Sequence, residues 1–528
     1  YNNFITYLKE KLMTVSHILT AALQGLEAVE VVAEVDMANS LPGISIVGLP
    51  DAAVNESKER IRSAIKNSSY NFPVKKVVIN LAPADLKKEG SGFDLPMAVG
   101  ILGCSGVIDV EKTKGFAFCG ELSLDGRLRA VNGILPIVAS LKNRGVQAVI
   151  LPEDNVKEAA LVSGIDIYPA EKLSDVVSMF CFEEPKLLPR YEFDSDSYLS
   201  SLQNRHIDFD FKDIKGQKKA KRALLIAAAG GHNILMSGAP GAGKTLLSKC
   251  FAGILPPLSI DEAIELTKIY SISGLIDRDK PLVSQRPFRS PHHSASSAGI
   301  IGGGSSPKPG EITLAHHGVL FLDEVVEFPR SVLEVLRQPL EDGVVTISRA
   351  MNSVKYPADF ILLAAMNPCP CGYFGDTKKQ CTCSASQVQR YVNRLSGPLL
   401  DRIDLQIDVP RLSEEELLDY SSSQDESSES MRLKVISARE MQKQRFKNSG
   451  IRTNSQMNIR LIKKYCKLDE RCENMMRSAI SHYNLSGRAF DRILKLSRTI
   501  ADLAGAEDIS FEHLAEALQY RTFSNNIF

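Results

Sequence analysis

The sequence predicts an α/β protein with three successive parts: an α+β unit, a core with a parallel sheet and a helical C-terminal block. Three patterns predict this division. Short β-branched runs alternate with helical stretches up to about residue 183, and glycine-rich loops flank short apolar runs from 211 to 410. Apolar residues then recur at helical spacing from 411 to 528. At roughly 150 residues per domain, the chain of 528 residues corresponds to three or four domains.

Composition excludes several classes of protein. Hydrophobic residues make up 44% of the chain and charged residues 24%, which is ordinary for globular proteins and excludes a disordered or fibrous chain. Lys+Arg and Asp+Glu both number 63, so net charge gives no evidence for or against a nucleic-acid partner. No apolar run approaches the roughly 18–20 residues that span a bilayer. Ten cysteines, six of them isolated, suit a reducing compartment. We expect a soluble, cytoplasmic protein.

The first part contains four runs that we expect to be strands and one stretch that we expect to be a helix. The strands are Val29–Val35, Ile44–Val47, Val77–Leu81 and Val149–Leu151, and the helix is Ala52–Lys66. This mixture is typical of α/β or α+β units, here residues 14–183. Residues 1–13 are expected to be an N-terminal extension, with Met13 as a candidate start. Residues 184–210 carry prolines and a polar stretch, which predicts a linker.

The C-terminal block, residues 411–528, has helical periodicity. The clearest segments are Ala489–Leu503 and Phe511–Leu518. The stretch Ser421–Ser430 is too polar to pack, and we expect a mobile loop or a helix break there.

A glycine-rich loop follows a short apolar run and precedes a predicted helix. The run is His232–Met236, and the helix is expected from Leu246. The loop has the pattern G-x-x-x-x-G-K-[ST] in a strand–loop–helix context, which is the signature of a phosphate-binding loop. Its residues are Gly238, Ala239, Pro240, Gly241, Ala242, Gly243, Lys244 and Thr245. We expect its backbone N–H groups to bind phosphates, Lys244 to reach the β- and γ-phosphates, and Thr245 to bind Mg²⁺. The alternative is a glycine-rich turn before a helix.

Two acids follow the next apolar run. Val319–Leu322 reads as a buried strand, and Asp323 and Glu324 come directly after it. Ligands bind at the carboxyl ends of strands in open α/β sheets, so these acids are expected beside the phosphate loop. Asp323 would hold Mg²⁺, and Glu324 would polarise the attacking water. Alone, the pair could be a solvated strand end.

A third apolar run, Phe360–Met366, ends in Asn367. An amide at the tip of a neighbouring strand would orient the lytic water or contact the γ-phosphate, so Asn367 is a third candidate site residue. The alternative is an Asn-Pro turn, which is common at strand ends.

These residues belong to a wider set of motifs by which the chain resembles the AAA+ ATPases of the magnesium-chelatase-like group, specifically the YifB/ComM family. The resemblance covers residues 14–522. The matching segments are Gly216–Gln217, Ala229–Asn233, Arg289–Ser294, Pro309–Ile312, Leu314–Gly318, Met366–Gly372, Leu395–Asp404 and Leu485–Arg488. It implies an AAA+ P-loop core at 211–410 and a helical C-terminal lid at 411–528.

The resemblance also implies roles for two arginines. Arg402 matches the arginine finger that acts on ATP bound by the next subunit, and Arg488 matches the sensor-2 arginine that closes over nucleotide in its own subunit. Each would bring a planar cation to developing phosphate charge. From spacing alone, either could be an ordinary surface ion pair.

The resemblance implies a function as well. It is an ATP- and Mg²⁺-dependent motor that acts on single-stranded or branched DNA. The expected form is a homo-hexameric ring that performs branch migration in homologous recombination and natural transformation. Two alternatives stay open: a protein-remodelling ATPase of the magnesium-chelatase type and, less favoured, an ATP-dependent protease.

The protease alternative arises because residues 14–183 resemble the proteolytic domain of Lon, which has a ribosomal-S5-like α+β fold. Lon-type proteases use a serine activated by a lysine. Gly92 stands where that family has its serine, although Ser91 is adjacent, and Leu135 stands where it has its lysine. We therefore expect a non-catalytic platform for assembly or binding.

Four cysteines lie close together after Asn367. Cys369, Cys371, Cys381 and Cys383 form a C-x-C…C-x-C pattern. Four thiolates supply the closed tetrahedral site that structural zinc favours. The alternative is four reduced thiols in a loop.

Histidine pairs and basic loops give weaker signals. Adjacent histidines on a strand point to opposite faces, so His292–His293 and His316–His317 are expected to structure loops or support the site rather than bind metal. Asp342–Gly343 before a β-branched run predicts a hairpin, whose Arg349 and Lys355 could project into a pore as in related AAA+ motors. The basic, glycine-rich loop 286–308 could track a phosphate backbone.

Overall fold

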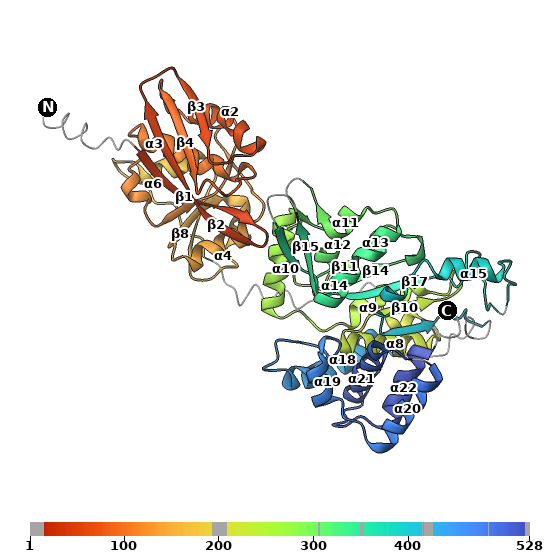
Figure 1. Ribbon diagram of the computed structural model, residues 1–528. Coiled ribbons are helices and arrows are strands. Elements are labelled where there is room, and N and C mark those ends of the chain that lie inside the picture. The colour runs from red at the N-terminus through yellow and green to blue at the C-terminus, as the bar shows by residue number, and fades with distance from the viewer. Residues whose placement is uncertain are drawn as a thin grey trace, which may run out of the picture. The chain divides into compact units, whose positions relative to one another are not determined.

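The computed structural model describes residues 15–192, 209–304, 307–348, 353–376, 378–413, 416, 426–483 and 485–522 (Figure 1). The predicted extension with Met13 and most of the predicted linker lie outside these residues. The chain forms two compact units. The first comprises Tyr1–Gln203, Ile260–Val283 and Ser305–Lys308, and the second comprises Asn204–Ser259, Ser284–Gly304 and Pro309–Phe528.

The first unit contains a mixed seven-stranded sheet with the order β3-β4-β2-β1-β5-β8-β9. Its strands are β1 (Val15–Gln24), β2 (Glu27–Ala38), β3 (Gly43–Val47), β4 (Lys76–Ala82), β5 (Phe116–Phe118), β8 (Ala148–Pro152) and β9 (Asp166–Ala170). Strands β1, β2 and β4 pair antiparallel, whereas β5, β8 and β9 continue the sheet in parallel from β1. All four predicted strands are present, so the expected α+β unit is confirmed.

Helices cover this sheet, and each buries an apolar face. They are α2 (Ala52–Asn67), α3 (Asp94–Cys104), α4 (Ile134–Asn143), α5 (Val156–Ala159) and α6 (Leu173–Phe180). The predicted helix Ala52–Lys66 corresponds to α2, which begins where the Asp51 side chain accepts a hydrogen bond from the Val54 N–H at 2.8 Å.

One helix of the first unit comes from the middle of the ATPase-like sequence. Helix α10 (Ile260–Ser273) packs on α4. The carbonyl of Ser271 accepts a hydrogen bond from the Gly133 N–H at 3.2 Å, and the Ser271 hydroxyl donates to the buried carboxylate of Glu158. The sequence pattern predicts this segment inside the core at 211–410. The chain therefore returns to the first unit at Ile260–Val283.

The two positions at which Lon-type proteases have their serine and lysine both lie in this unit. Gly92 is in a short 3-10 turn, and a Cβ placed there would lie 3.7 Å from Val131. Leu135 is fully buried in α4, and its N–H donates to Glu158 at 2.9 Å. The hydroxyl of Ser91 donates to Glu121. The described contact of Ser91 is thus with a carboxylate and not with a lysine.

The second unit is built on a parallel five-stranded sheet with the order β11-β14-β17-β10-β18. The strands are β10 (Ile234–Ser237), β11 (Phe288–Arg289), β14 (Val319–Leu322), β17 (Ile361–Met366) and β18 (Leu405–Asp408). Because all pairings are parallel, the carboxyl ends of the strands lie at one edge. The strands that precede Lys244, Asp323 and Asn367 are β10, β14 and β17. They are neighbours in this order, as predicted.

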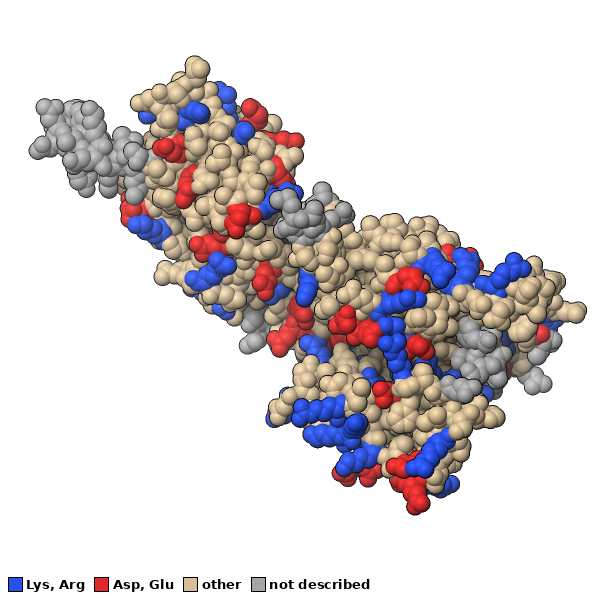
Figure 2. Space-filling model, viewed as in Figure 1, with Lys and Arg blue, Asp and Glu red and all other residues tan. Residues whose placement is uncertain are grey.

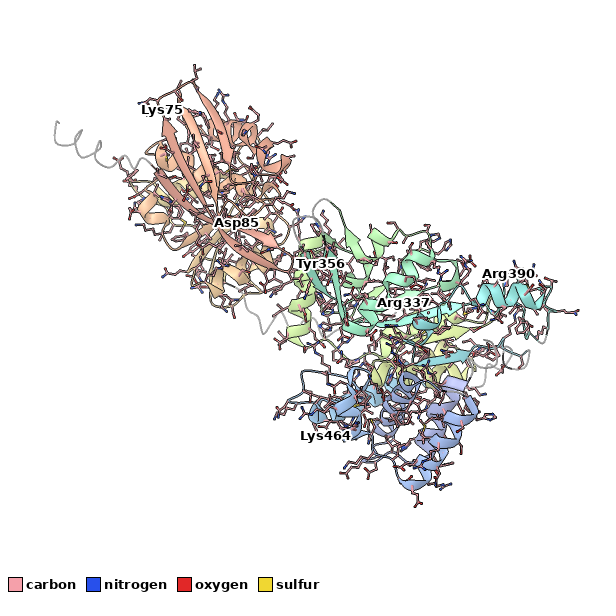
Figure 3. The ribbon with its side chains drawn as sticks, in the orientation of Figure 1. Lys75, Asp85, Arg337, Tyr356, Arg390 and Lys464 are labelled. Carbon is pink, nitrogen blue, oxygen red and sulfur yellow. The ribbon has the colours of Figure 1, made fainter. Side chains whose placement is uncertain are left out.

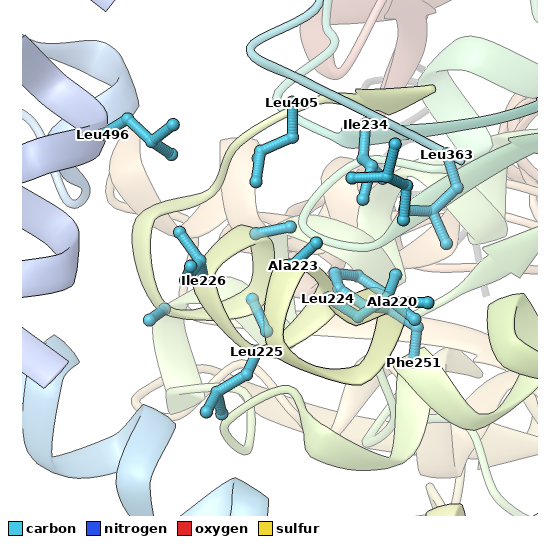
Figure 4. Close-up of a cluster of buried hydrophobic side chains, with 14 of the residues drawn as sticks. Ala220, Ala223, Leu224, Leu225, Ile226, Ile234, Phe251, Leu363, Leu405 and Leu496 are labelled. Atoms are coloured by element: carbon cyan, nitrogen blue, oxygen red, sulfur yellow. The ribbon is translucent and has the colours of Figure 1, made fainter. Parts of the chain in front are cut away.

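The core of the second unit forms where two helices pack on this sheet (Figure 4). They are α8 (Lys218–Gly230) and α9 (Lys244–Ile254). The run of alanines in α8 is fully buried, and small side chains let the helix approach its neighbours closely. The core side chains include Leu224 of α8, Phe251 of α9, Ile234 of β10, Leu363 of β17 and Leu405 of β18.

The C-terminal block is helical, as predicted. Its helices are α18 (Ser428–Arg445), α19 (Ile459–Tyr465), α20 (Glu470–Tyr483), α21 (Gly487–Leu503) and α22 (Phe511–Thr522). Helices α18 and α21 pack on α8. The last residues of the polar stretch Ser421–Ser430, which the structure describes, form the start of α18. The Ser427 side chain caps this helix by accepting a hydrogen bond from the Ser430 N–H at 3.2 Å. Among the described residues, no helix is long and apolar enough to cross a membrane.

The hairpin expected at Asp342–Gly343 has a different turn. Helix α13 (Arg330–Val335) is followed by α14 (Arg337–Asp342), and Gly343, at φ +67°, ends α14 with its N–H bonded to Pro339 O at 2.9 Å. The hairpin that follows is β15 (Val344–Ser348) with β16 (Ser353–Pro357). The prediction that Asp-Gly forms the turn is wrong, because a left-handed glycine serves helix ends and hairpins alike.

The turn of this hairpin, with Arg349, lies outside the described residues. Lys355 is exposed on β16, whereas its neighbour Tyr356, labelled in Figure 3, is buried.

Candidate active site

The phosphate loop leads from the end of β10 into α9. Gly241 and Gly243 have φ of +79° and +93°, which only glycine adopts without strain. A Cβ at Gly238 would lie 2.3 Å from the carbonyl oxygen of Val409, so this position also requires glycine. Helix α9 begins at Lys244, two residues before the predicted start at Leu246. The loop therefore ends on the N-terminus of a helix, whose free N–H groups and dipole favour an anion.

Lys244 occupies the centre of the site and is buried. Its Nζ donates to the carbonyls of Gly238 and Ala239, at 2.5 and 3.1 Å, and lies 3.3 Å from Asn367 Oδ1. Burial lowers the pKa of the ammonium group, and the carboxylate of Asp323 opposes that shift. The side chains of Lys244 and Asn367 therefore join the tip of β17 to the phosphate loop.

The two predicted magnesium ligands lie together. The Thr245 hydroxyl donates to Asp323 Oδ2 at 2.7 Å, although the two residues are 78 positions apart in the chain. Hydroxyl and carboxylate oxygens are the ligands that Mg²⁺ uses beside phosphates. The chemistry of this pair fits a magnesium ion.

Glu324 follows Asp323 at the end of β14 and has an exposed carboxylate. Its backbone is left-handed, at φ +50°, which is unusual for a residue other than glycine, and its N–H donates to Asp323 Oδ1 at 3.0 Å. The side chain is 55% exposed, so water can reach the carboxylate. Non-glycine residues in this conformation concentrate at functional sites. An exposed carboxylate next to the Mg²⁺ candidates can serve as a general base.

A histidine lies near this carboxylate. His293 Nδ1 is 3.9 Å from Glu324 Oε2, and the ring stacks on His292 at a centroid distance of 4.0 Å. His292 in turn bonds Ser294 through Nδ1 at 2.8 Å. The pair thus structures its loop and places one imidazole beside Glu324, as the sequence analysis expected. In the second pair, His316 Nδ1 accepts from the Asp359 N–H at 3.0 Å.

Sequence reasoning missed Tyr391, which lies on α15 (Ala385–Val392). Burial raises the pKa of Tyr391 to about 12, with further contributions from the carboxylates of Glu327 and Glu324, and the backbone of Asn367 faces its hydroxyl. The phenol therefore stays neutral and borders both Asn367 and Glu324. No sequence motif marks it, because α15 follows an irregular loop.

The two predicted arginines lie apart from this cluster in the described contacts. Arg402 is 13% exposed, donates to Pro398 O at 2.7 Å and is paired with Glu341. Arg488 is exposed on the first turn of α21. Neither contacts Lys244, Thr245 or Asp323 among the described residues.

Sequence reasoning missed a buried polar network centred on His232. His232 is fully buried between Asp404 Oδ2, at 3.2 Å from Nδ1, and Thr499 Oγ1, at 2.8 Å from Nε2. Asp404 also pairs with Arg492, and Asn233 Nδ2 donates to the carbonyl of Arg402 at 3.1 Å. The motifs Ala229–Asn233 and Leu395–Asp404 thus join the sheet to α21.

The four predicted zinc ligands converge. Cys369 Sγ lies 3.4 Å from Cys371 Sγ and 3.7 Å from Cys381 Sγ, and the latter two are 3.6 Å apart. All four ligand atoms, with Cys383, lie within 4.8 Å of one another. A tetrahedral site with Zn–S distances of about 2.3 Å has sulfurs about 3.8 Å apart, so the spacing fits zinc.

The basic loop 286–308 uses two of its arginines internally. Arg286 donates to Pro256 O at 2.7 Å and to His317 O at 2.6 Å. Arg289 forms a bidentate pair with Glu311 at 2.7 and 2.8 Å. These guanidinium groups hold the loop in place, which weakens the expectation that they track a phosphate backbone.

The parallel sheet, the phosphate loop after β10 and the paired acids after β14 define a P-loop ATPase. Family comparisons agree with this class. The model for magnesium chelatase subunit ChlI matches residues 210–417, the model for the ChlI C-terminal region matches 425–521, and a second model for ChlI matches 33–155.

Relatives extend the likeness over almost the whole chain. Competence protein ComM of Haemophilus influenzae is 45% identical over 512 residues, which cover 96% of this chain and 98% of ComM. YifB of Salmonella typhimurium is 42% identical over 509 residues, which cover 96% and 97%. A Lon protease of Leptospira interrogans is 25% identical over 27% of this chain and 18% of its own length. The chain belongs to the YifB/ComM family of magnesium-chelatase-like AAA+ ATPases, so the predicted resemblance and fold class are confirmed.

Proposed function

We propose that this protein is an ATP-driven motor that acts on DNA in the cytoplasm, as a hexameric ring that moves DNA branches during homologous recombination and natural transformation. The observation that carries the ATPase part is the convergence of Lys244, Thr245, Asp323 and Asn367 at one edge of the sheet. The DNA part is supported by the likeness to a protein named for competence.

In the proposed mechanism, the loop from Gly238 to Thr245 binds the phosphates of ATP, with Lys244 supplying the main side-chain cation. Thr245 and Asp323 would hold Mg²⁺, which would neutralise phosphate charge when bound. Glu324 accepts a proton from the attacking water, and Asn367 orients that water or contacts the γ-phosphate. Because Glu324 is exposed and Asn367 is tied to Lys244, water and phosphate would meet between them.

Two arginines would complete the site. We propose that Arg402 acts on ATP bound by the neighbouring subunit and that Arg488 closes over nucleotide from the lid of its own subunit. In the single chain Arg402 pairs with Glu341, which would release it when a neighbour supplies phosphate charge. A finger in trans makes the oligomer the active species. The first unit would serve as a non-catalytic platform for assembly or binding.

The visible distribution of surface charge neither identifies nor excludes a DNA-binding surface. Basic and acidic side chains are interspersed over most of the face seen in Figure 2. DNA contacts would then come from local basic groups such as the exposed Lys355 of the β15–β16 hairpin. Such contacts would be sequence-independent and sensitive to salt.

A test of the proposal compares ATP hydrolysis without DNA, with single-stranded DNA and with forked DNA. The DNA motor predicts stimulation that falls as salt is raised. A protein-remodelling ATPase is the second candidate, favoured by the match to the magnesium chelatase subunit. Stimulation by a protein partner but by neither form of DNA would refute the motor and support this candidate.

We also propose that Cys369, Cys371, Cys381 and Cys383 bind one structural zinc ion. The convergence of the four sulfurs supports it, and four protein ligands leave no open coordination position. Elemental analysis of the purified protein should find about one zinc per chain, and Cys371→Ser should lose it. A metal-free, fully active protein would contradict the zinc site.

A further inference from the structure

The loop that carries the four cysteines reaches the nucleotide site at two separate places. We propose that metal binding by the cysteine cluster controls ATP affinity through one of these contacts and turnover through the other. This inference rests on the proposed ATPase and zinc site and adds their coupling. The structural metal thereby supports the nucleotide site of its own subunit at both places.

The first contact is with the phosphate loop. Gly372 directly follows the first cysteine pair in the sequence. Its N–H donates to Cys369 O at 2.9 Å. It packs so closely on Pro240 that a Cβ at Gly372 would lie 2.7 Å from the proline Cδ. A glycine at φ +83° is thus required for the cysteine loop to support the phosphate loop.

Arg411 closes this contact from the other side. Its Nη2 donates to Pro240 O at 3.2 Å, and its Nε lies 3.2 Å from Asp376 Oδ2. The guanidinium also lies 5.2 Å from the ring centroid of Tyr373. Pro240 is therefore held by Gly372 and by Arg411, and Arg411 is held by two residues of the cysteine loop.

The second contact is made by α15, which begins directly after the last cysteine. The side chain of Ser384 accepts from the Gln387 N–H at 3.3 Å, and the side chain of Gln387 accepts from the Ser384 N–H at 2.9 Å, which forms a capping box. Because Cys383 immediately precedes this cap, its position fixes the start of the helix. The other end of α15 brings Tyr391 to the backbone of Asn367.

Apolar packing does little to hold the cysteine loop. Among its described residues from Pro370 to Cys383, Gly372 alone is buried, and Phe374 is 47% exposed. The free energy gained by burying so little surface does not offset the conformational entropy lost when the backbone is ordered. A structural metal supplies that free energy directly. Metal loss is therefore expected to release both contacts at once, while the sheet and α9 stay folded.

The experiment uses the full chain and measures three quantities: zinc content, affinity for a fluorescent ATP analogue, and kcat for ATP. The metal-site variant is Cys381→Ser, and its matched control is Cys181→Ser, a partly exposed cysteine of the first unit. Cys381→Ser should lose zinc, weaken ATP binding by about 10- to 100-fold and lower kcat, whereas the control should match the wild type. Chelation of the wild type should have the same effects, and added zinc should reverse them.

Two further variants separate the contacts. Gly372→Ala should keep zinc and weaken ATP binding, because the new methyl group collides with Pro240. Tyr391→Phe should keep zinc and ATP affinity but lower kcat by about 10-fold or more, because Asn367 loses its support. A general loss of structure would instead move affinity and kcat together in both variants.

The coupling is refuted if zinc is present and its reversible removal leaves both ATP affinity and kcat unchanged. It is also refuted if Gly372→Ala and Tyr391→Phe both behave like the wild type. These failures differ from failure of the underlying proposals. A wild type that does not hydrolyse ATP would refute the ATPase, and a wild type without zinc would refute the metal site.

Discussion

Replacing Asp404 by alanine is expected to destabilise the joint between the sheet and α21. The carboxylate is 6% exposed and accepts from the backbone N–H of Asn233, at 3.2 Å, as well as pairing with His232 and Arg492. Removing one partner of a buried ion pair costs about 3–5 kcal/mol, because the remaining charge stays buried. Every 1.4 kcal/mol is a factor of about ten, so the local opening equilibrium should rise by about 10²- to 10⁴-fold.

Hydrogen–deuterium exchange of peptides from β18 and α21 measures this opening directly. The control is Asp508→Ala, which removes an exposed carboxylate from the same unit. Arg492 and His232 hold the folded-state pKa of Asp404 far below its usual value, against the effect of burial. Its contribution to stability is therefore full above the unfolded pKa, about 3.9, and is lost as pH falls toward the folded value. Equal exchange in Asp404→Ala and Asp508→Ala at pH 7 would refute the reasoning.

Three other changes test the site, the ring and the core. Lys244→Ala should abolish binding of a fluorescent ATP analogue, because the phosphates lose their main side-chain cation, and normal affinity would overturn the site assignment. Arg402→Ala should bind ATP but lose hydrolysis by up to about 10³- to 10⁵-fold, and mixing it with Glu324→Gln chains should restore activity at interfaces that combine both intact halves. No recovery despite subunit exchange would exclude a finger in trans. Leu363→Ala, fully buried in the central strand, should lower the free energy of unfolding by about 2–5 kcal/mol, whereas Leu433→Ala, 62% exposed on α18, should change thermal unfolding little.

Features set by neighbouring residues could be predicted from the sequence. The phosphate loop before Lys244 is defined by a contiguous motif, and the acids and Asn367 each follow a contiguous apolar run. Parallel pairing then places their strand ends at one edge, which is why Lys244 meets Asn367 and Thr245 meets Asp323. The four cysteines were likewise close enough in sequence for their cluster to be expected.

Features set by distant contacts could not be predicted in this way. His232 and Asp404 are 172 positions apart in the sequence, and the residues around either one do not indicate which residue it will contact. Tyr391 reaches Asn367 only because an irregular loop returns the chain to the sheet. Helix α10 has only a weakly amphipathic sequence, and its packing on the first unit depends on the surface of α4. Gly343 shows that a left-handed glycine can end a helix where a turn was expected.

The central claim is that Glu324 activates water for hydrolysis of ATP held by the phosphate loop. The most direct test measures ATP binding and ATP turnover in the same preparations of wild-type protein and Glu324→Gln. Binding should be retained, because the amide keeps the shape of the side chain, and turnover should fall by about 10²- to 10⁴-fold. Near-normal turnover in Glu324→Gln would contradict the claim and mean that another residue activates the water.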